Sequence, residues 1–163
     1  MLNFPMRMLG LVGPILLLSL FGSAAVSRAA GCEDKISRHM VGEAMLAARF
    51  VAAAEKNGMT TSAINTVLKD IAANSAIQEF WITDSAGHAY LTNSEVDFTF
   101  SADPAKQPQA SEFWPLITGA KKVVIQAARK REIDNRIFKY VGVAGVDKPR
   151  IVQVGVSAAN LCK

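Results

Sequence analysis

The sequence predicts an α+β fold in which a long N-terminal helix packs on an antiparallel sheet of five to six strands. After an apolar leader, the first half has apolar residues at helical spacing. The second half changes to short aromatic and β-branched runs, separated by short turn-forming sequences. Because short connections require antiparallel pairing, these runs are expected to form one sheet, with the long helix on one of its faces.

Residues 1–29 have the pattern of a signal peptide. Arg7 precedes an uncharged apolar run, and small residues lead to a cleavage site near Ala29. Two alternatives stay open: the run approaches the roughly 18–20 residues that span a bilayer, so it could remain as an anchor, and Cys32 could carry a lipid. We therefore expect a periplasmic or secreted protein, which meets a membrane only if the leader is uncleaved or Cys32 is lipidated.

Residues 30–163 are long enough for a single compact domain. This part contains 16 basic and 14 acidic residues, and a net charge of only +2 argues against a nucleic-acid partner. Residues 121–150 hold nine bases and three acids, whereas residues 30–120 hold six bases and eleven acids. Either an anionic ligand or partner binds near the basic part, or acidic helices lie beside a basic sheet edge.

The two cysteines, Cys32 and Cys162, stand at opposite ends of this domain. In an oxidising compartment we expect them to form a disulfide that contributes about 2–4 kcal/mol, unless Cys32 is lipidated. His39 and His88 have no ligand-like spacing, so no metal or other cofactor is expected. Nucleophile, phosphate-loop and zinc-protease motifs are absent from the sequence, so we do not expect an enzyme.

Each element follows from its local pattern. Ile36, Met40, Ala44 and Val51 predict a helix that ends at Gly58. Threonine and serine residues then begin a second helix, and aromatic or β-branched runs predict the strands. The expected elements are helices over 33–58 and 60–75, strands over 76–84, 88–93, 96–101, 121–131, 136–145 and 149–157, and one helical turn within 111–119.

The run "EFWITDSAGHAYLTN", with a long helix before it and a loop and three antiparallel strands after it, resembles a single Cache domain. Cache domains are PAS-like extracytoplasmic sensor modules of bacterial chemoreceptors and histidine kinases. The resemblance covers residues 33–157 and implies small-molecule binding between the sheet and the connecting loop. The chain lacks the tyrosine, arginine, tryptophan and aspartate set of amino-acid-binding relatives, so the ligand class does not transfer. Because the sequence ends at Lys163 without an output domain, we expect a membrane-bound signalling partner.

The strands over 121–131 and 136–145 contain the candidate binding residues. A two-residue turn at Asp134 and Asn135 would place Arg129 opposite Tyr140, and Lys130 opposite Lys139. The first pair could form the floor of a pocket for a carboxylate, and an anion could lie between the two lysines. The alternative is a solvated edge, on which the lysines discourage aggregation.

Aromatic residues of the connecting loop are the remaining candidates. Trp114, and Phe100 from the strand over 96–101, could line the pocket or could only plug the sheet face. The sequence thus predicts a sensor-type domain that binds a small, possibly anionic ligand for signal transduction or chemotaxis. The alternative is a periplasmic interaction module without a ligand.

Overall fold

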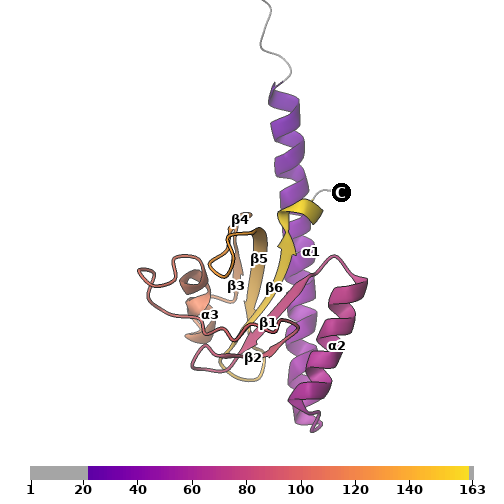
Figure 1. The fold of residues 1–163 in the computed structure, drawn as a ribbon, viewed down its shortest axis with the longest axis vertical. Helices are drawn as coiled ribbons and strands as arrows, with labels where there is room; N and C mark the ends of the chain where they lie inside the picture. Colours follow the sequence, from indigo (N-terminus) through magenta and orange to yellow (C-terminus); the bar gives the residue numbers. More distant parts are fainter. Residues whose placement is uncertain (1–21, 162–163) are drawn as a thin grey trace, which may run out of the picture.

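The computed structural model describes residues 22–161, with side chains from residue 31 onward. It confirms the predicted α+β architecture: a long helix packs on an antiparallel sheet of six strands (Figure 1). The elements in chain order are α1 (Gly22–Lys56), α2 (Thr61–Asn74), β1 (Glu79–Thr83), β2 (Ala89–Thr92), η1 (Ala110–Phe113), α3 (Trp114–Ile117), β3 (Val123–Ile125), β4 (Arg129–Lys130), β5 (Ile137–Ala144), β6 (Ile151–Ser157) and η2 (Ala158–Asn160).

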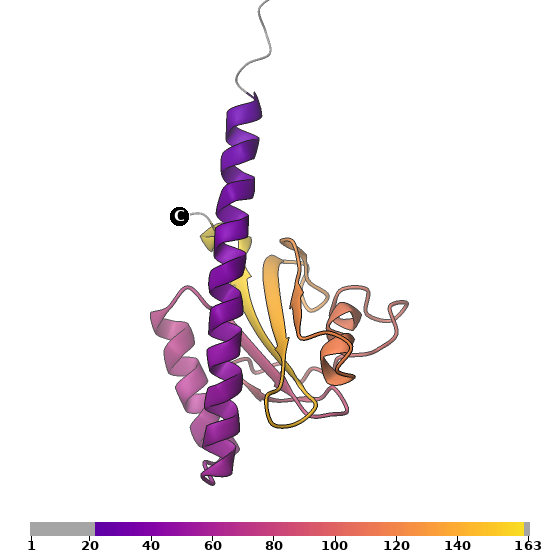
Figure 2. The same ribbon diagram turned by 180° about the vertical axis from the view of Figure 1, so that it is seen from behind.

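The strand order is β2-β1-β6-β5-β3, and β4 also pairs with β5. Helices α1 and α2 lie together on one face of the sheet, which we call the helix face (Figure 2). The segment 93–122, which contains η1 and α3, covers the opposite face, which we call the loop face. Side chains of β5 alternate between these faces, so that Val141 contacts the helices while Tyr140 packs beneath the segment 93–122.

Helix α1 begins eleven residues earlier than the predicted helix, inside the predicted leader. Its apolar stripe, with Met40, Ala44 and Val51, is buried on the helix face. Gly58, with a φ of 75°, ends this region, and the Thr60 hydroxyl accepts a hydrogen bond from Ala63 N at 3.2 Å to begin α2. Cleavage of the leader remains a prediction, because residues 1–21 lie outside the described residues.

Two of the predicted strands differ from the structure. Residues 96–101 form only an isolated bridge between Thr99 and His88. Their backbone–backbone hydrogen bonds within the described residues reach Ala89, at the start of β2, and Gly87, in the turn before it. The predicted strand over 121–131 is divided into β3 and β4, because the chain leaves the ladder after Gln126 and rejoins it at Arg129.

The predicted register of the hairpin is wrong. Arg129 pairs with Phe138 instead of Tyr140, and Lys130 pairs with Ile137 instead of Lys139. The turn is longer than two residues, because Asn135 takes a left-handed φ of 62° and Arg131 N donates to Arg136 O at 2.9 Å. The irregular residues 127–128 then shift the pairing of β3 by one further position.

No helix within residues 22–161 is both long and apolar enough to span a bilayer. Cys32 Sγ lies 3.4 Å from the carbonyl oxygen of Leu161, so the two ends of the domain meet. Cys162 lies outside the described residues, and the disulfide therefore stays a prediction.

Candidate functional site

A row of three residues across β5, β6 and β1 forms the base of the candidate site. Tyr140 is paired with Gly155, and Gly155 is paired with Glu79. A Cβ at Gly155 would lie 2.4 Å from a ring carbon of Tyr140, so only glycine lets the ring lie over β6. The Tyr140 hydroxyl thereby reaches across β6 and donates to Glu79 Oε2 at 2.7 Å.

Arg131, at the end of β4, holds this row from the other side. It forms a buried ion pair with Glu79, and its Nη1 lies 3.3 Å from the Tyr140 hydroxyl. Asp134 accepts hydrogen bonds from Arg131 Nε at 2.6 Å and from Arg131 Nη2 at 2.5 Å. The Arg131 guanidinium also lies 4.3 Å from the centre of the Phe138 ring. The cation is thus fixed by two carboxylates and one aromatic face.

These contacts decide the protonation states in the site. The hydrogen bonds from Arg131 lower the pKa of Asp134 well below its usual range, and the same bonds raise the pKa of Arg131. Burial, together with the charge of Glu79, raises the pKa of Tyr140. At neutral pH the tyrosine is therefore a neutral hydrogen-bond donor beside an ionised pair.

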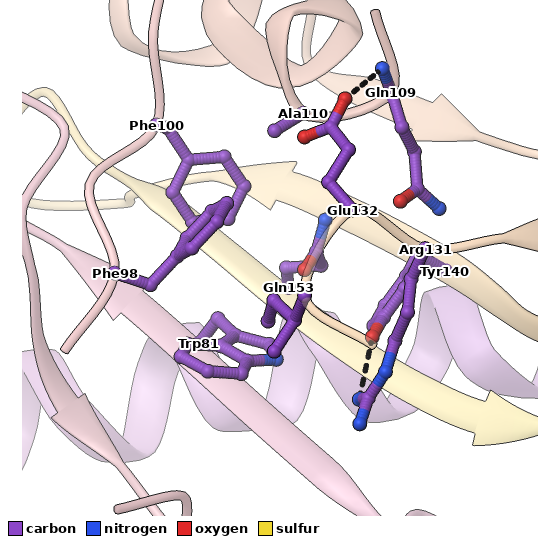
Figure 3. Close-up of a pocket in the computed structure, with 10 residues that line it drawn as sticks. Trp81, Phe98, Phe100, Gln109, Ala110, Arg131, Glu132, Tyr140 and Gln153 are labelled. Atoms are coloured by element: carbon purple, nitrogen blue, oxygen red, sulfur yellow. Dashed lines mark hydrogen bonds between the residues drawn. The ribbon is translucent and has the colours of Figure 1, made fainter. Parts of the chain in front are cut away.

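A small cavity adjoins this cluster on the loop face (Figure 3). Its volume of about 20 Å³ is room for about one water molecule. Trp81, Phe98 and Phe100 form an aromatic wall, in which the ring centres of Phe98 and Phe100 lie 5.0 Å apart. The other lining residues are polar or lie at the rim: Gln109, Ala110, Arg131, Glu132, Ile133, Tyr140 and Gln153.

Gln109, which lines this cavity, has a buried side-chain amide with an unpaired donor. The residue is only 8% exposed, and its side-chain Nε2 has no hydrogen-bond partner among the described residues. Its backbone N donates to Glu132 Oε1 at 2.6 Å, which holds the segment 93–122 against the turn before β5 (Figure 3). A buried unpaired amide donor is costly, so an acceptor is expected next to it.

The cover of the cavity depends on a second glycine. Gly142 on β5 leaves space that Phe113 and Leu116 fill, because a Cβ there would lie 2.7 Å from the Phe113 ring. Both side chains are fully buried. The segment 93–122 is therefore anchored at η1 and α3, close to the cavity wall that Gln109 contributes.

A series of hydrogen bonds and an ion pair joins the segment 93–122, which covers the cavity, to helix α1. Gln126 Nε2 donates to Gln109 O at 2.9 Å and to Glu112 Oε2 at 2.8 Å, both in the cover. The backbone oxygen of Gln126 accepts from Lys139 Nζ at 2.8 Å, and this ammonium also pairs with Glu33 of α1 at 3.0 Å. The hydrogen bond from Lys139 lowers the pKa of Glu33.

The structure brings together only some of the predicted binding residues. Phe100 and Tyr140 line the cavity. Trp114 packs beside Gly87 in the cover instead, and Arg129 is part-exposed and pairs with Glu112 at 2.7 Å. Lys139 is buried on the helix face, where its partner is Glu33 rather than an anion shared with Lys130.

Sequence reasoning missed Arg131, Glu79 and Gln109. Glu79 was the visible signal, as a single carboxylate inside the strand "EFWIT", which is buried throughout. A buried charge requires a partner. The partner itself could not be read from the sequence, because the predicted turn was too short and misplaced Arg131 relative to Tyr140.

The lining of the cavity combines aromatic rings with hydrogen-bonding side chains. Within the described residues no group of three metal-ligating side chains occurs. The cavity lining contains no serine, cysteine or histidine that could form a pair of nucleophile and general base. Small-molecule sites commonly combine an aromatic wall with a few hydrogen-bonding groups. No protein-family model matches the chain, and no curated protein sequence matches it.

Proposed function

We propose that this protein is an exported sensor-type domain that binds a small molecule on the loop face of the sheet, as a Cache domain does. Buried Gln109 carries the proposal, because this residue lines the cavity and its side-chain Nε2 has no acceptor among the described residues. A ligand oxygen would supply that acceptor. Trp81, Phe98 and Phe100 would contact the apolar part of the ligand.

The charges at the cavity favour a neutral ligand over an anion. Arg131 already has two carboxylate partners, Glu79 and Asp134, and Glu132 adds a third carboxylate at the rim. An anionic ligand would therefore compete with two carboxylates for one guanidinium and would be repelled by the third. A neutral molecule with a carbonyl or hydroxyl oxygen meets no such competition.

The ligand requires more room than the cavity offers. With about 20 Å³ available, the segment 93–122 has to move outward when a ligand enters. Gln109 of that segment accepts a hydrogen bond from the Gln126 side chain. The backbone oxygen of Gln126 contacts Lys139 and, through it, Glu33 of α1. We infer that this connection transmits ligand binding to the long helix, where a signalling partner reads it.

A thermal-shift screen with sets of neutral, anionic and amine compounds tests the proposal. We expect neutral oxygen-bearing compounds to raise the melting temperature, because specific ligands stabilise the folded state by mass action. Gln109→Ala should then weaken binding about tenfold, the effect of losing one or two hydrogen bonds. Lys130→Ala is the control, because this exposed residue does not line the cavity and has no carboxylate partner among the described residues.

The small volume of the cavity favours one second candidate, a protein-interaction module without a ligand. This function predicts that no compound in any set raises the melting temperature. It also predicts that Gln109→Ala leaves the affinity for a protein partner unchanged, since the cavity then has no role in binding.

A further inference from the structure

The two edges of the sheet differ in how their backbone is covered. At the β2 edge, Ala89 N donates to Phe98 O and Thr92 N donates to Asn65 Oδ1, both at 3.0 Å. Strand β3 forms the other edge and pairs only with β5 (Figure 2). An uncovered edge strand presents a row of backbone donors and acceptors to any chain that can pair with it.

The outward groups of β3 belong to Val123 and Ile125. Lys122 O accepts from Ala144 N, and Gln126 N donates to Tyr140 O, each at 3.0 Å, so the even-numbered residues face β5. The backbone groups of Val123 and Ile125 therefore point away from the sheet. No hydrogen bond to these outward groups exists within residues 22–161.

The side chains along this edge are apolar and exposed. Val123 is 38% and Ile125 is 50% exposed, and they lie on the helix face, opposite to buried Val124. A groove of about 350 Å³, lined by Val123, runs between this edge and α1. Met45 of α1 and Val146 of the β5–β6 turn, both about half exposed, line it as well.

The charge of this surface has one sign. Arg49 and Lys122 line the groove, which no carboxylate lines. Residues 121–131 contain five bases and no acid. Arg49, Lys121, Lys122 and Lys130 have no carboxylate within 4 Å in the described part of the chain.

We propose that β3 and the adjoining groove are a docking surface for an extended acidic segment of a partner protein, which adds to the sheet as a further strand. Backbone hydrogen bonds to Val123 and Ile125 would fix its register. An apolar side chain of the segment would enter the groove beside Met45, and flanking carboxylates would meet Arg49 and Lys122. This surface is independent of the cavity on the loop face.

A second copy of this chain does not fit the same surface. Two β3 edges that pair with each other would bring Lys121, Lys122 and Lys130 of both copies together without an intervening acid. Like charges on paired strands are destabilising. An acidic partner has the opposite charge and is the occupant that this edge selects.

The test measures binding of labelled eight-residue peptides by fluorescence anisotropy. One peptide alternates glutamate and valine, and the two controls replace glutamate with lysine or threonine. We expect the acidic peptide to bind about tenfold more tightly than the threonine control, which corresponds to a few partly exposed ion pairs. Hydrogen exchange of the Val123 and Ile125 amides should slow in the complex.

Two variants locate the contact. Ile125→Pro removes an outward N–H that the β3–β5 ladder does not use, so it should abolish binding, whereas Ile125→Thr keeps this N–H and should bind. Circular dichroism and the melting temperature check the fold of both. If Ile125→Pro does not fold, Arg49→Glu combined with Lys122→Glu should reverse the preference from the acidic to the basic peptide.

Three results would overturn the proposal. The first is equal binding of all three peptides, and the second is full binding by folded Ile125→Pro or by the charge-reversed variant. The third is concentration-dependent self-association in sedimentation that Ile125→Pro removes, which would make a second copy the occupant of the edge.

Discussion

The buried ion pair between Arg131 and Glu79 joins the end of β4 to β1 across the two strands that lie between them. Both residues are less than one-tenth exposed. Tyr140 and Trp81 donate to the same carboxylate, at 2.7 and 3.1 Å. The loop face is therefore held together by charge and hydrogen bonds as well as by apolar packing, and this has measurable consequences.

Arg131→Met should lower the free energy of unfolding by about 3–5 kcal/mol, because it leaves the charge of Glu79 buried without a cation. Urea unfolding followed by circular dichroism measures this change. Adding Glu79→Leu should recover much of the loss, since no uncompensated charge then remains. Lys130→Met, at the exposed neighbouring position, is the control and should change the stability by less than about 0.5 kcal/mol.

Gly155→Ala should destabilise the protein by about 1–3 kcal/mol, because its Cβ would lie 2.4 Å from Tyr140 and force the ring away from Glu79. Gly42→Ala, in the middle of α1 with open space around it, is the matched control and should stabilise by about 0.5–1 kcal/mol. Thermal unfolding of both variants measures the difference. Equal melting temperatures would show that Gly155 is not required for the approach of Tyr140.

Asp134 should make the stability depend on acid pH. Its folded-state pKa is lowered from 3.8 by the hydrogen bonds from Arg131, so its contribution is fully present above pH 3.8 and is lost as the pH falls through the folded-state pKa. The stability difference between the protein and Asp134→Asn should therefore be constant near neutral pH and shrink in strong acid. A difference that grows on acidification would contradict this linkage.

Glu33→Gln should loosen the connection between α1 and the sheet. Lys139 is 2% exposed, and Glu33 is its only carboxylate partner among the described residues. We expect a loss of about 1–3 kcal/mol and faster amide hydrogen exchange in residues 31–40. Lys139→Met in the same background should recover most of the stability, because it removes the buried charge. Exchange that stays unchanged in α1 would argue against the transmission route.

The predicted Cys32–Cys162 disulfide should be seen in the intact mass of the protein produced in an oxidising compartment, which would be lower by two hydrogens before reduction. Replacing both cysteines by serine should lower the stability by about 2–4 kcal/mol. The position of Cys32 beside Leu161 is the structural reason for this expectation. A lipid adduct at Cys32 would instead support the lipoprotein alternative.

The architecture of the protein could be predicted from its sequence. The helical spacing of Met40, Ala44 and Val51 specified α1, and the short turn-forming links specified an antiparallel sheet. The cavity lining could be predicted in part, because Phe100 and Tyr140 are two of the expected ligand contacts and both line the cavity. These features depend on the spacing of residues close together in the chain, so they can be predicted from the sequence.

The strand register and the partners of the charged residues follow from tertiary contacts, and the sequence did not reveal them. Asn135 adopts a left-handed conformation, and residues 127–128 leave the ladder, so that Arg129 moves to the surface and Arg131 reaches Glu79. A shift of one or two residues changes every cross-strand pair. The buried charged residues pair across the sheet with residues that are distant in the sequence. For this reason the site could be predicted only in part.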